Sequence, residues 1–202
     1  MKLGELVLLA LSRNPEKKDY SSSHDDYYCL RGTALVLLKS EFPNFLQLIS
    51  KKRIVDFGCG QGHQSVALVT EADCFVYGVD TNSKTLHKAI AMAGEKNIPG
   101  DRLKFRARMP PELRGTFDIV ISQDSMEHFP DPPAVLGEMK ALIKEDGKLL
   151  ITFGPPWFAP YGSHMSFFCR LPWINIFFSE KTVMKVRSRF RNDGAAKYVE
   201  VE

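Results

Sequence analysis

The chain has 202 residues, of which 44% are hydrophobic and 25% charged, and its formal net charge is +3. This length suits one compact domain with a sizeable core, and so small a charge argues against nucleic acid as a partner. The four cysteines, Cys29, Cys59, Cys74 and Cys169, are widely spaced without a CxxC pair, which argues against a zinc site or a disulfide framework. We therefore expect no bound metal and a reduced, cytoplasmic setting.

Residues 1–11 include a short apolar run that follows the acidic Glu5. The run is too short to span a bilayer and lacks the cleavage site of a signal peptide, so we expect no transmembrane segment. We interpret the run as a docking helix. Its apolar face is expected to contain Leu3, Leu6 and Leu9 or Leu11.

Strands and helices alternate from residue 51 onward. Before them, apolar residues recur at helical spacing over 27–45, and Pro43 is expected to divide this stretch into two short helices. Strands are then predicted at 54–57, 74–80, 103–106, 117–122 and 148–153, the last after a turn at Asp146-Gly147, and helices at 65–70, 81–93 and 134–143. Because these strands are nearly all apolar, the pattern predicts a Rossmann-like, doubly wound α/β fold, in which a mainly parallel sheet carries helices on both faces.

The pattern changes after Gly154. Residues 157–178 are dense in aromatic side chains, and a last helix is predicted over 179–190. We divide the chain into an N-terminal helical cap (1–50), a core (51–154) and an aromatic-rich cover segment with the last helix (155–202), within one compact domain overall.

The motif with the clearest chemistry follows the first predicted strand. Gly58, Gly60 and Gly62 alternate with other residues after Asp56 and before a predicted helix. Glycine lets a ligand approach the backbone closely, and a turn that opens a helix directs free N–H groups at that ligand. Asp80 ends the second strand, where a carboxylate can accept both hydroxyls of a ribose. These features predict a cradle for a nucleotide-type cofactor.

Five stretches taken together resemble class I S-adenosylmethionine-dependent methyltransferases. They are Val55-Asp56-Phe57-Gly58-Cys59-Gly60-Gln61-Gly62, Gly78-Val79-Asp80, Phe117-Asp118-Ile119-Val120, Ser125-Met126-Glu127-His128-Phe129 and Gly147-Lys148-Leu149-Leu150-Ile151. Their order fits the family over roughly residues 50–154. Within the family, the chain is most similar to small-molecule methyltransferases of ubiquinone-biosynthesis type. The resemblance implies S-adenosyl-L-methionine as the cofactor.

The same resemblance implies a cofactor-binding role for residues around the glycine turn and the next strand ends. They are Asp56, Gly58, Gly60, Asp80, Thr81, Gln123 and Asp124. Asp56 would reach the cofactor's amino group, Asp80 would hold the ribose and Thr81 would lie along the adenosine. Gln123 and Asp124 would flank the sulfonium, and an acidic rim suits a ligand that carries an ammonium and a sulfonium.

The sequence departs from the family in two places. Many members have an acidic residue after the third strand, and here Arg106 stands at about that position. Members also usually end in an antiparallel strand pair, for which the residues after the last predicted helix leave no room. We therefore expect the C-terminal strands of the sheet to be truncated.

Three residues outside the cradle are candidates for binding or catalysis. His128 follows the fourth strand, where it is either a general base or a packing residue ahead of Pro130. His164, in the aromatic segment, is favoured slightly as a base or a substrate contact. Arg31 either pairs with the cofactor's carboxylate or is solvated.

These observations predict methyl transfer to a small-molecule or glycan acceptor, with oxygen favoured as the acceptor atom. One alternative is an NAD(P)-dependent oxidoreductase or epimerase, against which His63 counts because a dinucleotide fingerprint has glycine there. Another is a non-catalytic S-adenosylmethionine-binding subunit. The aromatic residues of 157–178 either line a substrate pocket or dock the protein on a partner or a membrane surface, and some belong to the core.

Overall fold

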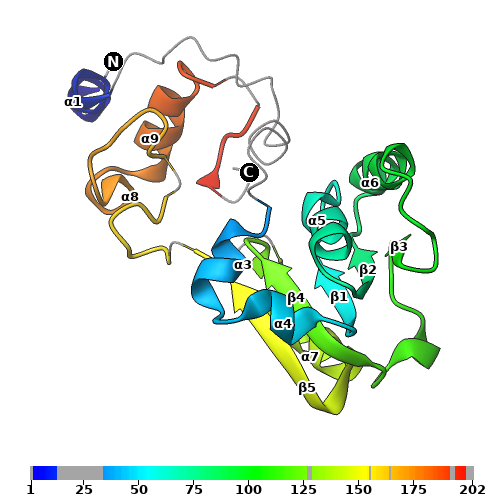
Figure 1. The fold of residues 1–202 in the computed structure, drawn as a ribbon. Helices are drawn as coiled ribbons and strands as arrows, with labels where there is room; N and C mark the ends of the chain where they lie inside the picture. The colour runs from blue at the N-terminus through cyan, green and yellow to red at the C-terminus, as the bar shows by residue number, and fades with distance from the viewer. Residues whose placement is uncertain are drawn as a thin grey trace. The chain divides into compact units, whose positions relative to one another are not determined.

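The computed structural model describes residues 2–12, 34–126, 129–154, 156–163, 165–191 and 194–198. The chain forms two compact units, one of residues 22–152 and the other of residues 1–21 and 153–202. The strands are β1 (Arg53–Phe57), β2 (Phe75–Val79), β3 (Leu103–Arg106), β4 (Phe117–Gln123) and β5 (Ile143–Thr152) (Figure 1). The helices are α1 (Leu3–Leu11), α3 (Val36–Glu41), α4 (Phe45–Ile49), α5 (His63–Glu71), α6 (Ser83–Glu95), α7 (Pro132–Leu142), α8 (Ile174–Phe177) and α9 (Glu180–Arg187), with a 3-10 turn at Pro111–Leu113.

The larger unit is built on a parallel sheet whose strand order is β3-β2-β1-β4-β5 (Figure 1). The chain moves from β1 outward to β3, then crosses back to β4 on the other side of β1. The strand order therefore reverses at β1, and open α/β sheets bind their ligands at the carboxyl ends of the strands beside such a reversal. The predicted Rossmann-like α/β fold with a parallel sheet is confirmed.

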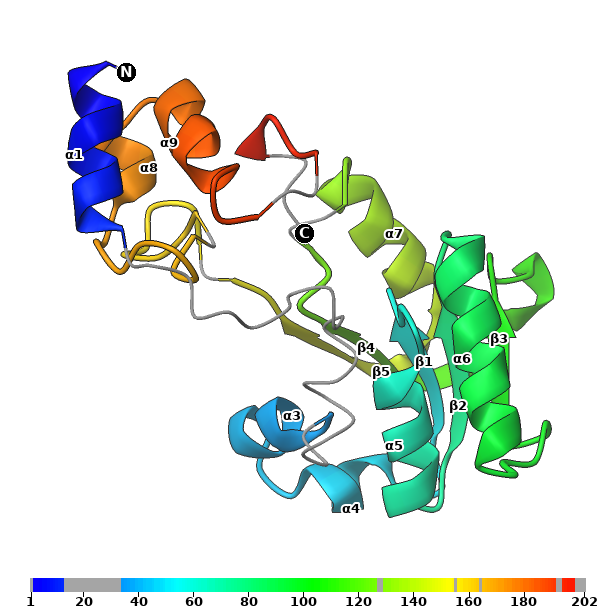
Figure 2. The same cartoon turned by 90° about the horizontal axis from the view of Figure 1, so that it is seen from above.

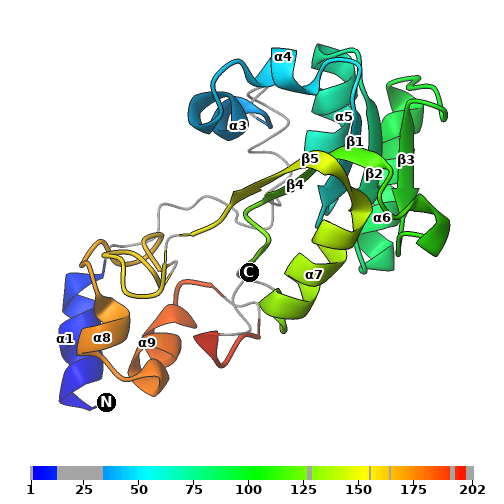
Figure 3. The ribbon, with the colours of Figure 1, turned by 90° about the horizontal axis from the view of Figure 1, so that it is seen from below.

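Both faces of the sheet are covered by helices. Ile54 of β1 packs in a core cluster with residues of α3, α4 and α5, and α5 and α6 lie together on this side of the sheet (Figure 2). The next residue, Val55, belongs to a second cluster that includes Met139 of α7, which lies against β4 and β5 (Figure 3). Successive side chains of a strand point to opposite faces, so strands buried on both sides are apolar at nearly every position.

The chain bends within β5 at the turn predicted at Asp146-Gly147. β5 is assigned from Ile143, where α7 ends, but Phe117 pairs with Ile143 and Ile119 with Lys148, so regular pairing with β4 begins at Lys148. A Cβ at position 147 would lie 2.1 Å from Ile143 Cγ2 and 3.0 Å from the Asp118 carbonyl oxygen. Residues four apart in an extended strand could not approach so closely, so the chain folds back here and glycine is needed because neighbouring atoms crowd its backbone.

The helical stretch before β1 is divided as predicted at Pro43, which lies between α3 and α4. The part of that stretch before residue 34 lies outside the described residues. Leu38 of α3 and Phe45 of α4 are buried in the core cluster beneath β1, so these short helices cover one face of the sheet.

The smaller unit has its own core, formed around α1 and α9. The expected apolar face of α1 is wrong at positions 3, 6 and 11, where the leucines are exposed. Leu9, the alternative to Leu11, is partly buried against the core of this unit, and Leu8 and Glu5 are buried. Leu8 packs with Val183 and Met184 of α9, and Glu5 forms an ion pair with Lys185 at 2.9 Å. Among the described residues, no helix combines the length and the apolar character needed to cross a bilayer.

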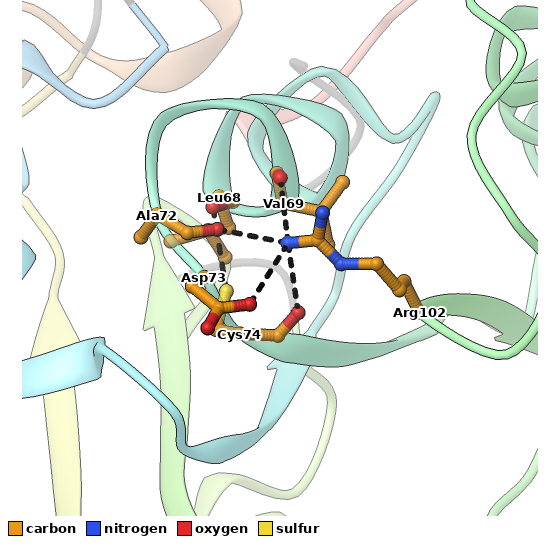
Figure 4. A network of polar contacts seen from close by, with 6 residues as sticks. All are labelled: Leu68, Val69, Ala72, Asp73, Cys74 and Arg102. Atoms are coloured by element: carbon orange, nitrogen blue, oxygen red, sulfur yellow. Dashed lines mark hydrogen bonds and ion pairs between the residues drawn. The ribbon is translucent and has the colours of Figure 1, made fainter.

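A single arginine closes the carboxyl end of α5 in the larger unit (Figure 4). Arg102 Nη2 donates hydrogen bonds to the carbonyl oxygens of Val69 and Ala72, each at 3.0 Å, and of Cys74 at 3.4 Å. The last carbonyls of a helix have no partner within the helix, and a guanidinium both satisfies them and complements the helix dipole.

Replacing Arg102 with alanine is expected to lower the free energy of unfolding by about 1–3 kcal/mol, since charge-assisted bonds to these carbonyls are lost. For a chain of this size, that corresponds to a decrease of several degrees in Tm. Thermal unfolding followed by circular dichroism measures the change. Arg102→Lys should retain part of the stability, and Arg114→Ala, at an exposed position, is the control; equal Tm values for Arg102→Ala and Arg114→Ala would contradict this role.

Candidate functional site

The glycine turn after β1 has the backbone geometry that its sequence predicts. Gly58, Gly60 and Gly62 have φ values of +79°, +51° and +82°, which L side chains rarely adopt. The amides of Gly58 and Cys59 both donate to the Val79 carbonyl oxygen, at 2.8 and 3.0 Å, so the turn is fixed to the end of β2. In the described part of the chain, no atom beyond its own sequence neighbours lies within 4 Å of where a Cβ on Gly60 would be. Gly60 therefore presents open backbone to a ligand.

Asp80 joins the glycine turn to the beginning of α6. Its Oδ2 accepts a hydrogen bond from the Gly60 amide at 2.9 Å, and its Oδ1 accepts from the Asn82 amide at 2.8 Å. Asn82 in turn caps α6 by accepting a hydrogen bond from the Lys84 amide. The Thr85 hydroxyl also lies 3.4 Å from Oδ1, as a long hydrogen bond. Oδ2 has only the Gly60 amide as a donor, so it keeps a lone pair that can accept a ligand hydroxyl while Asp80 stays fixed to the turn. Thr81 follows it and is exposed.

Asp56 is buried below the turn, with 2% of its surface exposed. Its Oδ1 accepts from Gln64 Nε2 at 2.7 Å and its Oδ2 from the Ser65 hydroxyl at 2.5 Å. Both carboxylate oxygens are thus engaged by α5, and the structure places Asp56 as a link between β1 and α5. Burial raises the pKa of Asp56 from 3.8 to about 6, the nearby Asp80 charge adds to the increase, and the two hydrogen bonds oppose it.

This raised pKa predicts a pH dependence of stability. Between pH 4 and 6 the native carboxyl holds a proton that the unfolded chain has already lost, so this group's contribution decreases as pH rises, by about 3 kcal/mol over the interval. Asp56→Asn keeps a side chain that can bond Gln64 and Ser65, and it should abolish this decrease. Urea denaturation at several pH values measures it.

Asp118 is a carboxylate whose pKa is shifted in the opposite direction, so its contribution to stability changes with pH in the opposite sense. Burial tends to raise its pKa, but the hydrogen bonds from Lys144 and from the Arg53 amide outweigh this, so the pKa is lowered. The stabilisation from Asp118 is therefore present above its unfolded pKa and lost as pH falls further, the opposite sign to Asp56. A pH profile for Asp56→Asn that is parallel to that of the wild type would contradict the Asp56 assignment.

The carboxyl end of β4 lies beside the glycine turn because β4 pairs with β1. The Gln123 side-chain oxygen is buried and has no hydrogen-bond partner among the described residues. Asp124 has φ +49° and its amide donates to the Thr152 carbonyl oxygen, which fixes the chain as it leaves the strand. Buried polar atoms in native proteins are nearly always paired, so Gln123 is suited to accept a bond from a ligand.

Ser125 is a site residue to which the sequence assigned no role. Its hydroxyl donates to the Gln123 carbonyl oxygen at 2.9 Å and lies 3.3 Å from that of Gly58. A Cβ at position 58 would lie only 2.7 Å from the Ser125 oxygen, so Gly58 is required for packing as well as for its φ value. The only sequence signal for Ser125 is its position: it is the first residue of the fourth motif and directly follows Gln123-Asp124.

The structure brings together seven of the predicted cofactor residues within one unit. They are Asp56, Gly58, Gly60, Asp80, Thr81, Gln123 and Asp124. The predicted roles of His128, His164 and Arg31 fall on positions outside the described residues. Asp118 lies at the opposite end of β4 and has the structural role that its hydrogen bonds indicate.

Together, the strand reversal at β1, the open glycine turn and the carboxylate of Asp80 define an α/β domain that binds a nucleotide-type cofactor. The family model described as "Methyltransferase domain" matches residues 48–154, which contain all of these features. The chain therefore belongs to the methyltransferase domain family.

Individual relatives agree with this assignment. The ubiquinone biosynthesis O-methyltransferase of Neisseria meningitidis serogroup C is 28% identical over 144 residues, which cover 69% of this chain and 50% of the relative. The chain thus spans about half the length of the curated relatives it matches.

Solved structures are similar over a comparable part of the chain. Phosphoethanolamine N-methyltransferase 2 from Haemonchus contortus, solved with phosphomonomethylethanolamine and S-adenosylhomocysteine, has a TM-score of 0.52 and 25% identity, covering 61% of this chain and 28% of that one. A putative S-adenosyl-L-methionine-dependent methyltransferase from Methanococcus maripaludis has a TM-score of 0.55 at 20% identity, covering 71% of this chain and 67% of that one, which supports the fold.

Proposed function

We propose that the protein is an S-adenosyl-L-methionine-dependent methyltransferase that methylates a small-molecule or glycan acceptor at oxygen. The observation that carries the proposal is the arrangement of Asp80 against the Gly60 amide, at the carboxyl edge of β1 and β2. Similarity to an O-methyltransferase of ubiquinone biosynthesis supports oxygen as the acceptor atom. The family match favours this activity over the oxidoreductase alternative.

The residues present fit this cofactor. Gly60 leaves space beside its backbone for a ligand, and Asp80 offers acceptor lone pairs that a ribose diol would use. The unpaired Gln123 oxygen can accept a bond from an ammonium or a hydroxyl, and the negative charge of Asp80 favours a cationic ligand. When bound, the cofactor supplies an electrophilic methyl group on a sulfonium. The protein supplies orientation, proximity and exclusion of water.

The hydrogen bonds that Asp56 accepts from α5 change the role that we propose for this residue. Because Asp56 is 2% exposed and its two oxygens accept from Gln64 and Ser65, whereas Asp80 is partly exposed, we propose that Asp56 positions the turn and α5. The cofactor's amino group then uses other acceptors such as Gln123. We assign the contact with the cofactor's carboxylate to Arg31. His164, or else His128, is proposed as the base that takes the proton from the attacking oxygen.

The remaining parts of the chain are assigned as follows. We propose that residues 1–50 act as a cap, that 51–154 bind the cofactor and that 155–202 cover the substrate or dock on a partner or a membrane surface. A cytoplasmic setting is supported by Cys59, Cys74 and Cys169, which are free thiols and buried.

Calorimetric titration of the purified protein with S-adenosylmethionine and, separately, with NADH tests the function. We expect binding of S-adenosylmethionine and no comparable binding of NADH. Incubation with labelled cofactor and a panel of phenols, catechols and sugars then tests transfer to oxygen. Tighter binding of NADH would overturn the assignment, and transfer only to amines would overturn the choice of oxygen.

A further inference from the structure

A hollow lies at the amino edge of the sheet, at the ends of the strands opposite to the cofactor cradle. Arg53 and Phe75 are the first residues of β1 and β2, whereas the cradle follows their last residues. The hollow has a volume of about 530 Å³ and is lined by Lys51, Lys52, Arg53, Phe75, Tyr77, Asp101, Asp118 and Lys144. The methyl-transfer chemistry proposed above uses none of these residues.

The lining of this hollow is positively charged. It includes four cationic side chains and two carboxylates, and one of these carboxylates, Asp118, is already engaged by Lys144 at 2.8 Å and by the Arg53 amide. A smaller adjoining hollow shares Lys52 and Asp118 and adds Lys148 and Asp146, so it leaves the excess of positive charge unchanged. Clefts lined by one sign of charge concentrate ligands of the opposite sign, so the hollow favours an anion.

Two aromatic rings lie beside these cations. The register of β1 and β2 pairs Arg53 with Phe75 and Val55 with Tyr77, so alternate residues place Arg53 and both rings on one face of the sheet. Phe75 is 42% exposed at this edge. Tyr77 is partly exposed and has the Lys104 ammonium 5.7 Å from its ring centroid. An exposed aromatic surface next to excess positive charge suits a planar ring that carries an anionic group.

We propose that this hollow is a second binding site, for a small phosphate-bearing ligand with a planar ring, which is the chemistry of a nucleotide. The phosphate would lie among Lys51, Lys52 and Arg53, where a guanidinium and ammonium groups are available as charge-assisted donors. The planar ring would lie against Phe75 and Tyr77. The site is separate from the cofactor cradle, because the two are at opposite edges of the same sheet.

Titration calorimetry with uridine diphosphate, pyrophosphate and uridine tests the proposal at low ionic strength. We expect uridine diphosphate to bind best and its affinity to fall sharply in about 1 M salt, where the Debye length is ~3 Å. Lys52→Glu should weaken it at least about tenfold, because the substitution reverses a charge at close range. Phe75→Ala should weaken uridine diphosphate but leave pyrophosphate unchanged. Both positions are exposed, so both variants should fold.

Two controls separate this site from other causes. Lys181→Glu makes the same charge change at an exposed position in the other unit and should leave binding unchanged. Asp80→Ala should also leave it unchanged, because Asp80 belongs to the cradle. The proposal is overturned if uridine diphosphate does not bind the wild type, if Lys52→Glu binds it equally well, or if pyrophosphate binds as tightly as uridine diphosphate. Loss of binding in Asp80→Ala would also overturn it, by placing the nucleotide in the cradle.

Discussion

Replacing Asp80 with alanine is expected to weaken S-adenosylmethionine binding by at least about 100-fold. The carboxylate has two acceptor oxygens at the cradle, and hydrogen bonds to a charged acceptor contribute about 1.5–3 kcal/mol each. The substitution also removes the bond from the Gly60 amide, which holds the turn in the conformation that presents open backbone. Calorimetric titration with S-adenosylmethionine measures the loss.

Asp80→Asn separates charge from geometry in that experiment. Asparagine retains one acceptor oxygen, so we expect it to lose less affinity than alanine does. Glu95→Ala removes an exposed carboxylate elsewhere on α6 and should bind like the wild type. Circular dichroism of each variant confirms folding. An Asp80→Ala affinity within twofold of the wild-type value would refute the cradle assignment while leaving the fold intact.

The sequence predicted the sheet well because buried parallel strands have a strong local signature. β3 was predicted at its observed bounds, and β1, β2 and β4 within one or two residues. β1, β2 and β4 are mainly apolar, whereas β3 alternates apolar and basic residues. The position of Asp80 beside the glycine turn was predictable for the same reason, because a carboxylate that ends a buried strand lies at the edge where ligands bind, and its role in binding stays a prediction.

Contacts between distant residues were less predictable. Asp56 looked like a cofactor ligand from its place beside the glycines, yet Gln64 and Ser65 of the following helix engage both of its oxygens. Gly147 was predictable as a turn residue, but the close approach of Ile143 Cγ2 and the Asp118 carbonyl oxygen to its backbone was not. Local sequence patterns do not contain such tertiary contacts.

The same distinction applies to α1 in the smaller unit. The leucine spacing predicted an apolar face of which positions 3, 6 and 11 are exposed, because the helix instead buries Leu8 and the Glu5 carboxylate, which pairs with Lys185 of α9. A short helix with apolar residues all round has no unique face, so the partner decides which side is buried.

Gly62→Ala is expected to destabilise the larger unit by about 3 kcal/mol, for two reasons that add. The positive φ of +82° costs an L residue about 1–2 kcal/mol, and overpacking of a close contact costs about 1–3 kcal/mol. The added Cβ would lie 2.8 Å from both Ala89 Cβ and Phe105 Cζ, so α6 and β3 would have to move. Chemical denaturation followed by far-UV circular dichroism measures the loss.

Gly115→Ala isolates the first of these reasons, the cost of a positive φ. Gly115 has a φ of +64°, but among the described residues no neighbouring atom lies within 4 Å of where its Cβ would be, so only the backbone cost of about 1–2 kcal/mol is expected. A clear excess for Gly62→Ala over Gly115→Ala would show that the third glycine of the motif is required by packing between the turn, α6 and β3. Equal losses would show that its φ value alone is required. In that case Gly62 would serve only to turn the chain into α5, and the Phe105 side chain would be able to move away from an added Cβ.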